Sequence, residues 1–242
     1  HTHVFKQDPA DVVRAMDEAG LETIVNMGVG MDEVYKAFSS RFEKAFPGRF
    51  AHFALIHWDA AFRRADFGQG LAEGLERAVG MGAKGIKIWK DAGLTVRTPD
   101  GRLLRLDDER LDPLYAKAGE LGVAVCFHSV DPPSFFEPQD RFNERYKELA
   151  AHPDWHFFGP QFPTRDEVLA QRDAAMAKHP KTTFIGAHFG ALATDLPRVG
   201  ALLDRLPNFF LDTSARIRDL GRQPYSARRF FIRYQDRILF GT

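Results

Sequence analysis

The stretch VAVCFHSV, residues 123–130, decides the fold class of this chain of 242 residues. Its β-branched and aromatic residues make a run of strand length, and the preceding residues 108–122 have the spacing of an amphipathic helix. Similar strand-like runs alternate with helical stretches along the whole chain. Such alternation predicts a parallel sheet, because a chain that returns to the same strand direction needs a crossover, usually a helix.

The pattern gives eight strands and seven helices. The expected strands are 1–5, 22–28, 49–58, 83–90, 123–130, 182–190, 208–215 and 237–242, and the expected helices are 9–20, 32–46, 68–82, 108–122, 165–178, 196–206 and 225–234. This number of units at this length favours an α/β fold of the (β/α)8 TIM-barrel type, spanning 1–242 as one domain, over an open doubly wound sheet. The first strand starts at residue 1 and no helix follows the last strand, so we expect a barrel truncated at both ends.

Composition narrows the class of partner. Lysine plus arginine and aspartate plus glutamate number 33 each, which gives no net field to attract nucleic acid or an anionic membrane. Residues 1–242 contain no apolar run of membrane-spanning length. The single cysteine, Cys126, excludes an internal disulfide framework and fits a reducing compartment. We therefore expect a cytoplasmic protein with a small-molecule substrate, and a homo-oligomer is compatible with this interpretation.

Residues 131–163 interrupt the alternation between the fifth strand and its helix. This excursion is far longer than the usual connection of a few residues. Loops that follow barrel strands lie on the catalytic face, so its prolines and aromatic residues predict a partly helical lid over a pocket.

Four histidines are placed so that they can meet at one end of the barrel. His1 and His3 are two residues apart, so on a strand both point to the same face. His128 and His188 share the inward parity of their strands, and each lies near the carboxyl end. Convergence of imidazoles from three strands predicts a metal site.

These motifs resemble the metal-dependent amidohydrolase superfamily, in its amidohydrolase family 2 branch, which contains aminocarboxymuconate-semialdehyde decarboxylase and related hydrolases. The resemblance rests on HTH at 1–3, CFHS at 126–129, GAHFG at 186–190 and RILFGT at 237–242. It implies that His1, His3 and His128 hold one divalent ion, preferably zinc, and that His188 is catalytic. It also implies a further metal-binding aspartate after FGT, a position that would follow Thr242.

Three further residues are candidates for substrate binding. Lys87 and Trp89 share inward parity in GIKIWK, and Arg216 follows the seventh strand. Three roles for Lys87 stay open: a carboxylated bridge between two metals, an ammonium that binds a substrate carboxylate, or a buried ion pair with an inward acid such as Asp212. Arg216 could bind a carboxylate through its guanidinium fork or lie in a solvated loop.

The expected function is a metal-dependent hydrolase of the amidohydrolase type that attacks a small organic acid, amide or lactone with an activated water. Zinc lowers the pKa of a bound water from about 16 toward about 7, which supplies the nucleophile at neutral pH. The alternatives are a metal-dependent decarboxylase or hydratase of a carboxylated substrate, and a barrel that binds metal or ligand without turnover.

Overall fold

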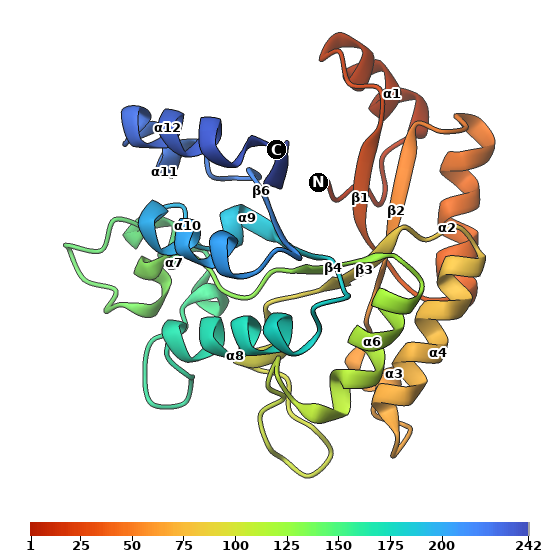
Figure 1. Cartoon of the computed structure of the whole chain (residues 1–242), viewed down its shortest axis with the longest axis horizontal. Coiled ribbons are helices and arrows are strands. Elements are labelled where there is room, and N and C mark those ends of the chain that lie inside the picture. Colours follow the sequence, from red (N-terminus) through yellow and green to blue (C-terminus); the bar gives the residue numbers. More distant parts are fainter. Residues whose placement is uncertain (242) are drawn as a thin grey trace.

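The structure is a computed structural model that describes residues 1–241 (Figure 1). Seven parallel strands form one sheet in sequential order, and helices connect them. The strands are β1 (Ile24–Val29), β2 (Phe50–Leu55), β3 (Gly85–Ile88), β4 (Ala124–Phe127), β5 (Phe184–Gly186), β6 (Phe209–Asp212) and β7 (Ile238–Leu239). Each expected strand from the second to the eighth is therefore present, although most are shorter than the sequence pattern predicts.

The seven expected helices are also present. They are α1 (Pro9–Glu18), α2 (Asp32–Ala45), α4 (Phe67–Gly80), α6 (Asp112–Glu120), α8 (Arg165–Lys178), α10 (Leu196–Arg205) and α12 (Pro224–Tyr234). Four short helices, α3 (Trp58–Ala61), α5 (Asp91–Leu94), α9 (Ala187–Gly190) and α11 (Ile217–Gly221), lie between them. No helix of residues 1–241 is both long and apolar enough to cross a membrane.

The first expected strand is the clearest departure from prediction. Residues 1–5 contribute one parallel bridge, from Thr2 to Asn26 of β1, and no strand. The side chain of His1 nevertheless contacts Asp212 at the end of β6, so the N-terminal segment links β1, at one edge of the curled sheet, to β6. The sheet of residues 1–241 is thus a curled half-barrel of seven strands, and closure into an eight-stranded barrel stays a prediction.

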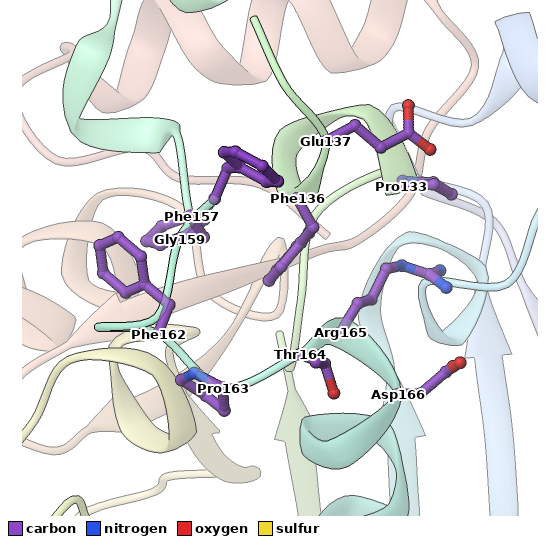
Figure 2. Close-up of a pocket in the computed structure, with 11 residues that line it drawn as sticks. Pro133, Phe136, Glu137, Phe157, Gly159, Phe162, Pro163, Thr164, Arg165 and Asp166 are labelled. Carbon is purple, nitrogen blue, oxygen red and sulfur yellow. The ribbon is translucent and has the colours of Figure 1, made fainter.

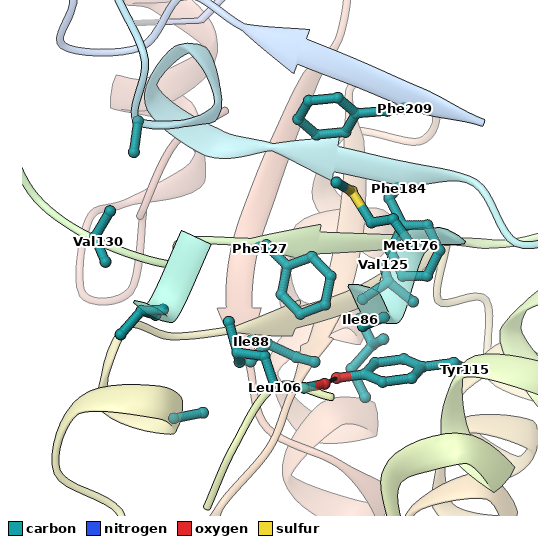
Figure 3. Close-up of a cluster of buried hydrophobic side chains, with 14 of the residues drawn as sticks. Ile86, Ile88, Leu106, Tyr115, Val125, Phe127, Val130, Met176, Phe184 and Phe209 are labelled. Carbon is teal, nitrogen blue, oxygen red and sulfur yellow. Dashed lines mark hydrogen bonds between the residues drawn. The ribbon is translucent and has the colours of Figure 1, made fainter. Parts of the chain in front are cut away.

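Alternate side chains of the strands face two different layers. Ile86, Ile88, Val125 and Phe127 pack toward the helices in the main hydrophobic core, where Phe184 stacks on Phe127 (Figure 3). The opposite set lines the concave side, where Cys126 packs with Met27, Phe53 and Ile185. The inward parity predicted for Cys126 is correct, and Lys87 lies directly opposite it in the register of β3 and β4.

The 131–163 excursion contains the partly helical structure expected of it. It holds two 3-10 turns, η2 (Pro133–Phe136) and η3 (Pro153–Trp155), and helix α7 (Tyr146–Ala151). The other two 3-10 turns, η1 (Glu109–Leu111) and η4 (Gln235–Arg237), precede α6 and β7. Thr164 caps α8 with a capping box to Glu167, so the excursion ends sharply.

Candidate active site

The four histidines predicted from the sequence lie together where the strands end. The ring centroids of His128 and His188 are 4.4 Å apart, those of His1 and His188 5.4 Å, and those of His1 and His3 5.2 Å. The segments that carry them are separated by up to 187 residues of chain. The curl of the sheet brings these segments together. Their meeting at one end of the sheet agrees with the predicted parallel arrangement, in which all strands end on the same side.

His188 reaches the cluster by a different backbone route from the one predicted. The inward parity predicted for His188 is wrong, because Phe184 packs toward the helices and Ile185 toward the concave side, and β5 ends at Gly186. Instead, four consecutive residues from His188 to Ala191 have φ between 58° and 61°, which is a left-handed turn. This conformation is uncommon for residues other than glycine and concentrates at functional sites. The backbone N–H of His188 donates to Asp212 Oδ1 at 2.9 Å.

Each histidine of the cluster has one ring nitrogen occupied by an oxygen acceptor. His3 Nδ1 lies 2.7 Å from the carbonyl of Met27, and His188 Nδ1 lies 2.9 Å from the carbonyl of Ser214. A carbonyl only accepts, so in both rings Nδ1 carries the proton and Nε2 keeps its lone pair.

The other two rings are oriented by carboxylates. His1 Nδ1 lies 2.5 Å from Asp212 Oδ2, and His128 Nε2 lies 3.3 Å from Asp131 Oδ1. The free lone pairs are then on Nε2 of His1 and Nδ1 of His128. Metal-binding histidines have this arrangement, in which the second nitrogen donates to a carboxylate or a carbonyl.

The donor set of His1, His3 and His128 therefore fits a divalent ion in its chemistry. Over residues 1–241, however, no three His, Cys, Asp or Glu side chains gather closely enough to hold an ion as they stand. The ligand assignment stays a prediction, and it rests on which nitrogens are free.

The environment keeps three of the four imidazoles neutral. Burial, reinforced by the charges of Lys87 and Lys90, lowers the pKa of His128 to about 4, against the opposing effect of Asp131. Burial and the neighbouring His128 and Arg216 lower the pKa of His188 to about 3, and burial also lowers the pKa of His3. Neutral imidazole is the form that binds a metal or accepts a proton.

Lys87 is fully buried at the base of the site. Its Nζ lies 3.8 Å from Cys126 Sγ and 5.6 Å from the ring centroid of Trp89, and no ion pair to it occurs within residues 1–241. The pairing with Asp212 that the sequence left open is not formed, because Asp212 contacts His1, Ser214 and the His188 backbone instead. A buried ammonium without a carboxylate is costly, so the prediction that Lys87 binds a substrate carboxylate stays open.

Trp89 and Arg216 lie beside different histidines of the cluster. The Trp89 ring lies 5.1 Å from His3 and 6.0 Å from His128 between centroids. Arg216 is 7% exposed and donates from Nε to the His188 carbonyl at 3.3 Å, so it is not a solvated loop residue. Burial lowers the pKa of Arg216, although Asp219 opposes the shift.

Sequence reasoning missed two acids that orient the histidines. Asp212 was recognised as inward from its strand parity, but its partner is His1, 211 residues away. Asp131 was placed only as the start of the lid. Its position three residues after His128 was the available signal, because the chain turns there after β4.

The 131–163 excursion lines a separate cavity. A cavity of about 490 Å³ is lined by rings from both its ends, including Phe136, Phe157 and Phe162, and by Arg165 at the start of α8 (Figure 2). Arg165 donates to the backbone carbonyls of Asp131, at 3.3 Å, and Ala191. It thus joins the loops that follow His128 and His188.

Comparison with known proteins agrees with this geometry. The amidohydrolase family profile matches residues 6–242, nearly the whole chain. The chain belongs to the amidohydrolase family. Proteins of this family generally use a divalent metal ion. No match was found among curated proteins.

Several solved structures share the amidohydrolase fold seen here. A 2,6-dihydroxybenzoate decarboxylase from Rhizobium has a TM-score of 0.60 at 20% identity, covering 96% of this chain and 76% of that one. A 5-carboxyvanillate decarboxylase from Novosphingobium aromaticivorans, complexed with manganese, has a TM-score of 0.56 at 16% identity, with 96% and 69% covered. A probable 2-pyrone-4,6-dicarboxylic acid hydrolase from Acinetobacter baumannii has a TM-score of 0.55 at 10% identity, with 100% and 75% covered.

Proposed function

We propose that this amidohydrolase-family protein is a metal-dependent hydrolase of a small organic acid. The observation that carries the proposal is the cluster of four imidazoles next to two buried cationic side chains, Lys87 and Arg216. His1, His3 and His128 would hold the ion, preferably zinc, through their free ring nitrogens. A bound divalent ion would supply a Lewis acid and an acidified water.

The cations determine the class of substrate. Lys87 has no carboxylate partner in residues 1–241, whereas Arg216 forms an ion pair with Asp219 at 3.7 Å and also contacts backbone carbonyls beside His188. A substrate carboxylate would neutralise the charge of Lys87, and an ion pair at such a buried position is strong. The ring of Trp89 offers a flat apolar surface 5.6 Å from the Lys87 ammonium.

His188 is the proton-transfer residue of this proposal. The Ser214 carbonyl fixes its proton on Nδ1, so Nε2 carries the lone pair. Its lowered pKa keeps His188 neutral at neutral pH, so the ring can accept a proton from the attacking water. It would afterwards return this proton to the leaving group. The left-handed turn and the Asp212 contact hold the ring in place.

A second candidate is decarboxylation of a carboxylated substrate by the same site. The buried ammonium of Lys87 favours it, since a carboxylate would be held at the base of the site, and two of the fold neighbours are decarboxylases by name. In this reaction Nε2 of His188, which carries no proton in the resting form, would first take up a proton from water and then deliver it to the carbon that loses carbon dioxide.

The test is a screen of the protein, loaded with zinc or manganese, against small aromatic acids, dicarboxylates, lactones and amides. Carbon dioxide release and water incorporation are measured separately, which distinguishes decarboxylation from hydrolysis. The His188→Asn variant should keep its metal and lose about 10²- to 10⁴-fold in kcat on the active substrate. An unchanged kcat would refute the assigned role, and loss of metal would make His188 a ligand.

A further inference from the structure

An ion network outside the four-histidine cluster connects it to the lid. Asp131 is 7% exposed, and its two carboxylate oxygens have different partners: Oδ1 faces His128 Nε2 at 3.3 Å, and Oδ2 forms an ion pair with Lys90 Nζ. Lys90 follows β3, whereas Asp131 follows β4. One carboxylate therefore joins a lysine of one strand to a histidine of the next.

The same lysine is covered by the lid. Its Nζ lies 5.3 Å from the ring centroid of Trp155 and 5.2 Å from that of Phe157, within the range of a cation–π interaction. Phe157 is tied back to the start of the excursion by its backbone N–H, which donates to the Phe135 carbonyl at 2.8 Å. The side chain of Lys90 is 19% exposed as a result.

We propose that Lys90 is a positioning residue that couples the end of the lid that carries Trp155 and Phe157 to the orientation of His128. With the lid in place, the two aromatic rings hold the ammonium against Asp131, and Asp131 holds the imidazole with its Nδ1 lone pair free. When the segment with Trp155 and Phe157 lifts, water reaches Lys90 and Asp131, the carboxylate gains other partners, and His128 is no longer fixed. The coupling rests on the proposed function, in which His128 binds the ion.

Coupling of this kind works in both directions. If the lid favours the ordered state of His128, then a ligand of His128 must favour the closed lid by the same free energy. A purely structural ion pair would instead change the free energy of unfolding and leave lid opening insensitive to metal. This difference separates the two roles without any need for a substrate.

The experiment measures the rate of trypsin cleavage within the lid, at the exposed Arg141 and Lys147, together with the affinity for Mn²⁺. In the unsubstituted protein, Mn²⁺ should slow this cleavage several-fold. In Lys90→Met, cleavage should be faster and independent of Mn²⁺, and the affinity should fall about 10-fold, as expected when the partner of a ligating histidine is disturbed. Lys90→Arg, which keeps the cation over the rings, should restore both. The matched control is Lys84→Met, an exposed lysine before the same strand, and should change neither.

A second variant approaches the network from the lid. Trp155→Leu removes one ring over Lys90 and should lower the Mn²⁺ affinity by about two- to fivefold. Trp155 stacks on His152 and contacts none of the four clustered histidines, so this effect would have to pass through Lys90. Unchanged affinity in both Lys90→Met and Trp155→Leu would overturn the coupling. If no variant and no unsubstituted protein binds Mn²⁺, the proposed function fails, while faster lid cleavage in Lys90→Met would still show that Lys90 holds the lid.

Discussion

At the scale of single residues, His52 is the most unusual side chain away from the site. It lies on the helix-facing side of β2, is 2% exposed, and packs among Phe38, Phe42 and Phe50. Neither of its ring nitrogens has a hydrogen-bond partner in residues 1–241. Burial lowers its pKa to about 4, so this imidazole is neutral in the folded protein at pH 7.

This residue gives a prediction about stability and pH. The pKa of His52 is about 4 when folded and about 6.5 when unfolded, so between these values the unfolded chain binds more protons. The contribution of His52 is therefore constant above pH 6.5 and becomes destabilising as the pH falls from 6.5 toward 4. His52→Phe should remove this component and, by removing two unpartnered polar atoms, stabilise the protein by about 1 kcal/mol at pH 7.

The measurement is the urea midpoint of both proteins at intervals from pH 4 to 8. The advantage of the His52→Phe variant should grow as the pH falls below 6.5. Curves that stay parallel through this range would show that the native imidazole titrates normally. The histidines of the site are present in both proteins, so their titration cancels in the comparison.

At the scale of elements, the position of α4 depends on the absence of a side chain at Gly68. A Cβ placed there would lie 1.6 Å from the carbonyl oxygen of Arg110, so α4 can touch the 3-10 turn before α6 only because residue 68 is glycine. Gly80, the last residue of the same helix, has nothing within 4 Å of such a Cβ. The pair makes a matched test of packing against helix propensity.

Gly68→Ala should destabilise the protein by about 2–3 kcal/mol, because backbone must move to relieve the overlap. Gly80→Ala should be neutral or stabilising by up to about 1 kcal/mol, because alanine restricts the unfolded chain without a clash. Chemical denaturation of the two variants checks both signs. Equal effects at the two positions would mean that α4 does not pack as described.

At the scale of the whole molecule, the alternation of strands and helices could be predicted from the sequence because each pattern is local. The limits of α8 agree with prediction, since Thr164 and Glu167 supply the cap. The shortness of β5 could not be predicted, because the left-handed turn at His188 depends on contacts with β6. Residues 1–5 do not form the predicted strand, because within this segment only Thr2 makes a bridge to β1.

The site could be predicted only in part, for the same physical reason. Strand parity and position near strand ends identified His1, His3, His128 and Lys87 as inward residues, and these lie together. Their partners are set by tertiary contacts. The pairing of His1 with Asp212 spans 211 residues, and neither the free Lys87 ammonium nor the Lys90 contact with the lid leaves a local pattern.

The central claim is that the curled sheet brings His1, His3 and His128 together to hold one divalent ion. Its most direct test is the metal content per chain of the purified protein and of the His1→Ala, His3→Ala double variant, measured by elemental analysis after dialysis. The exposed His57 provides the control, His57→Ala. The account predicts about one ion per chain in the unsubstituted protein and the control, and close to none in the double variant. Equal metal content in all three proteins would contradict it.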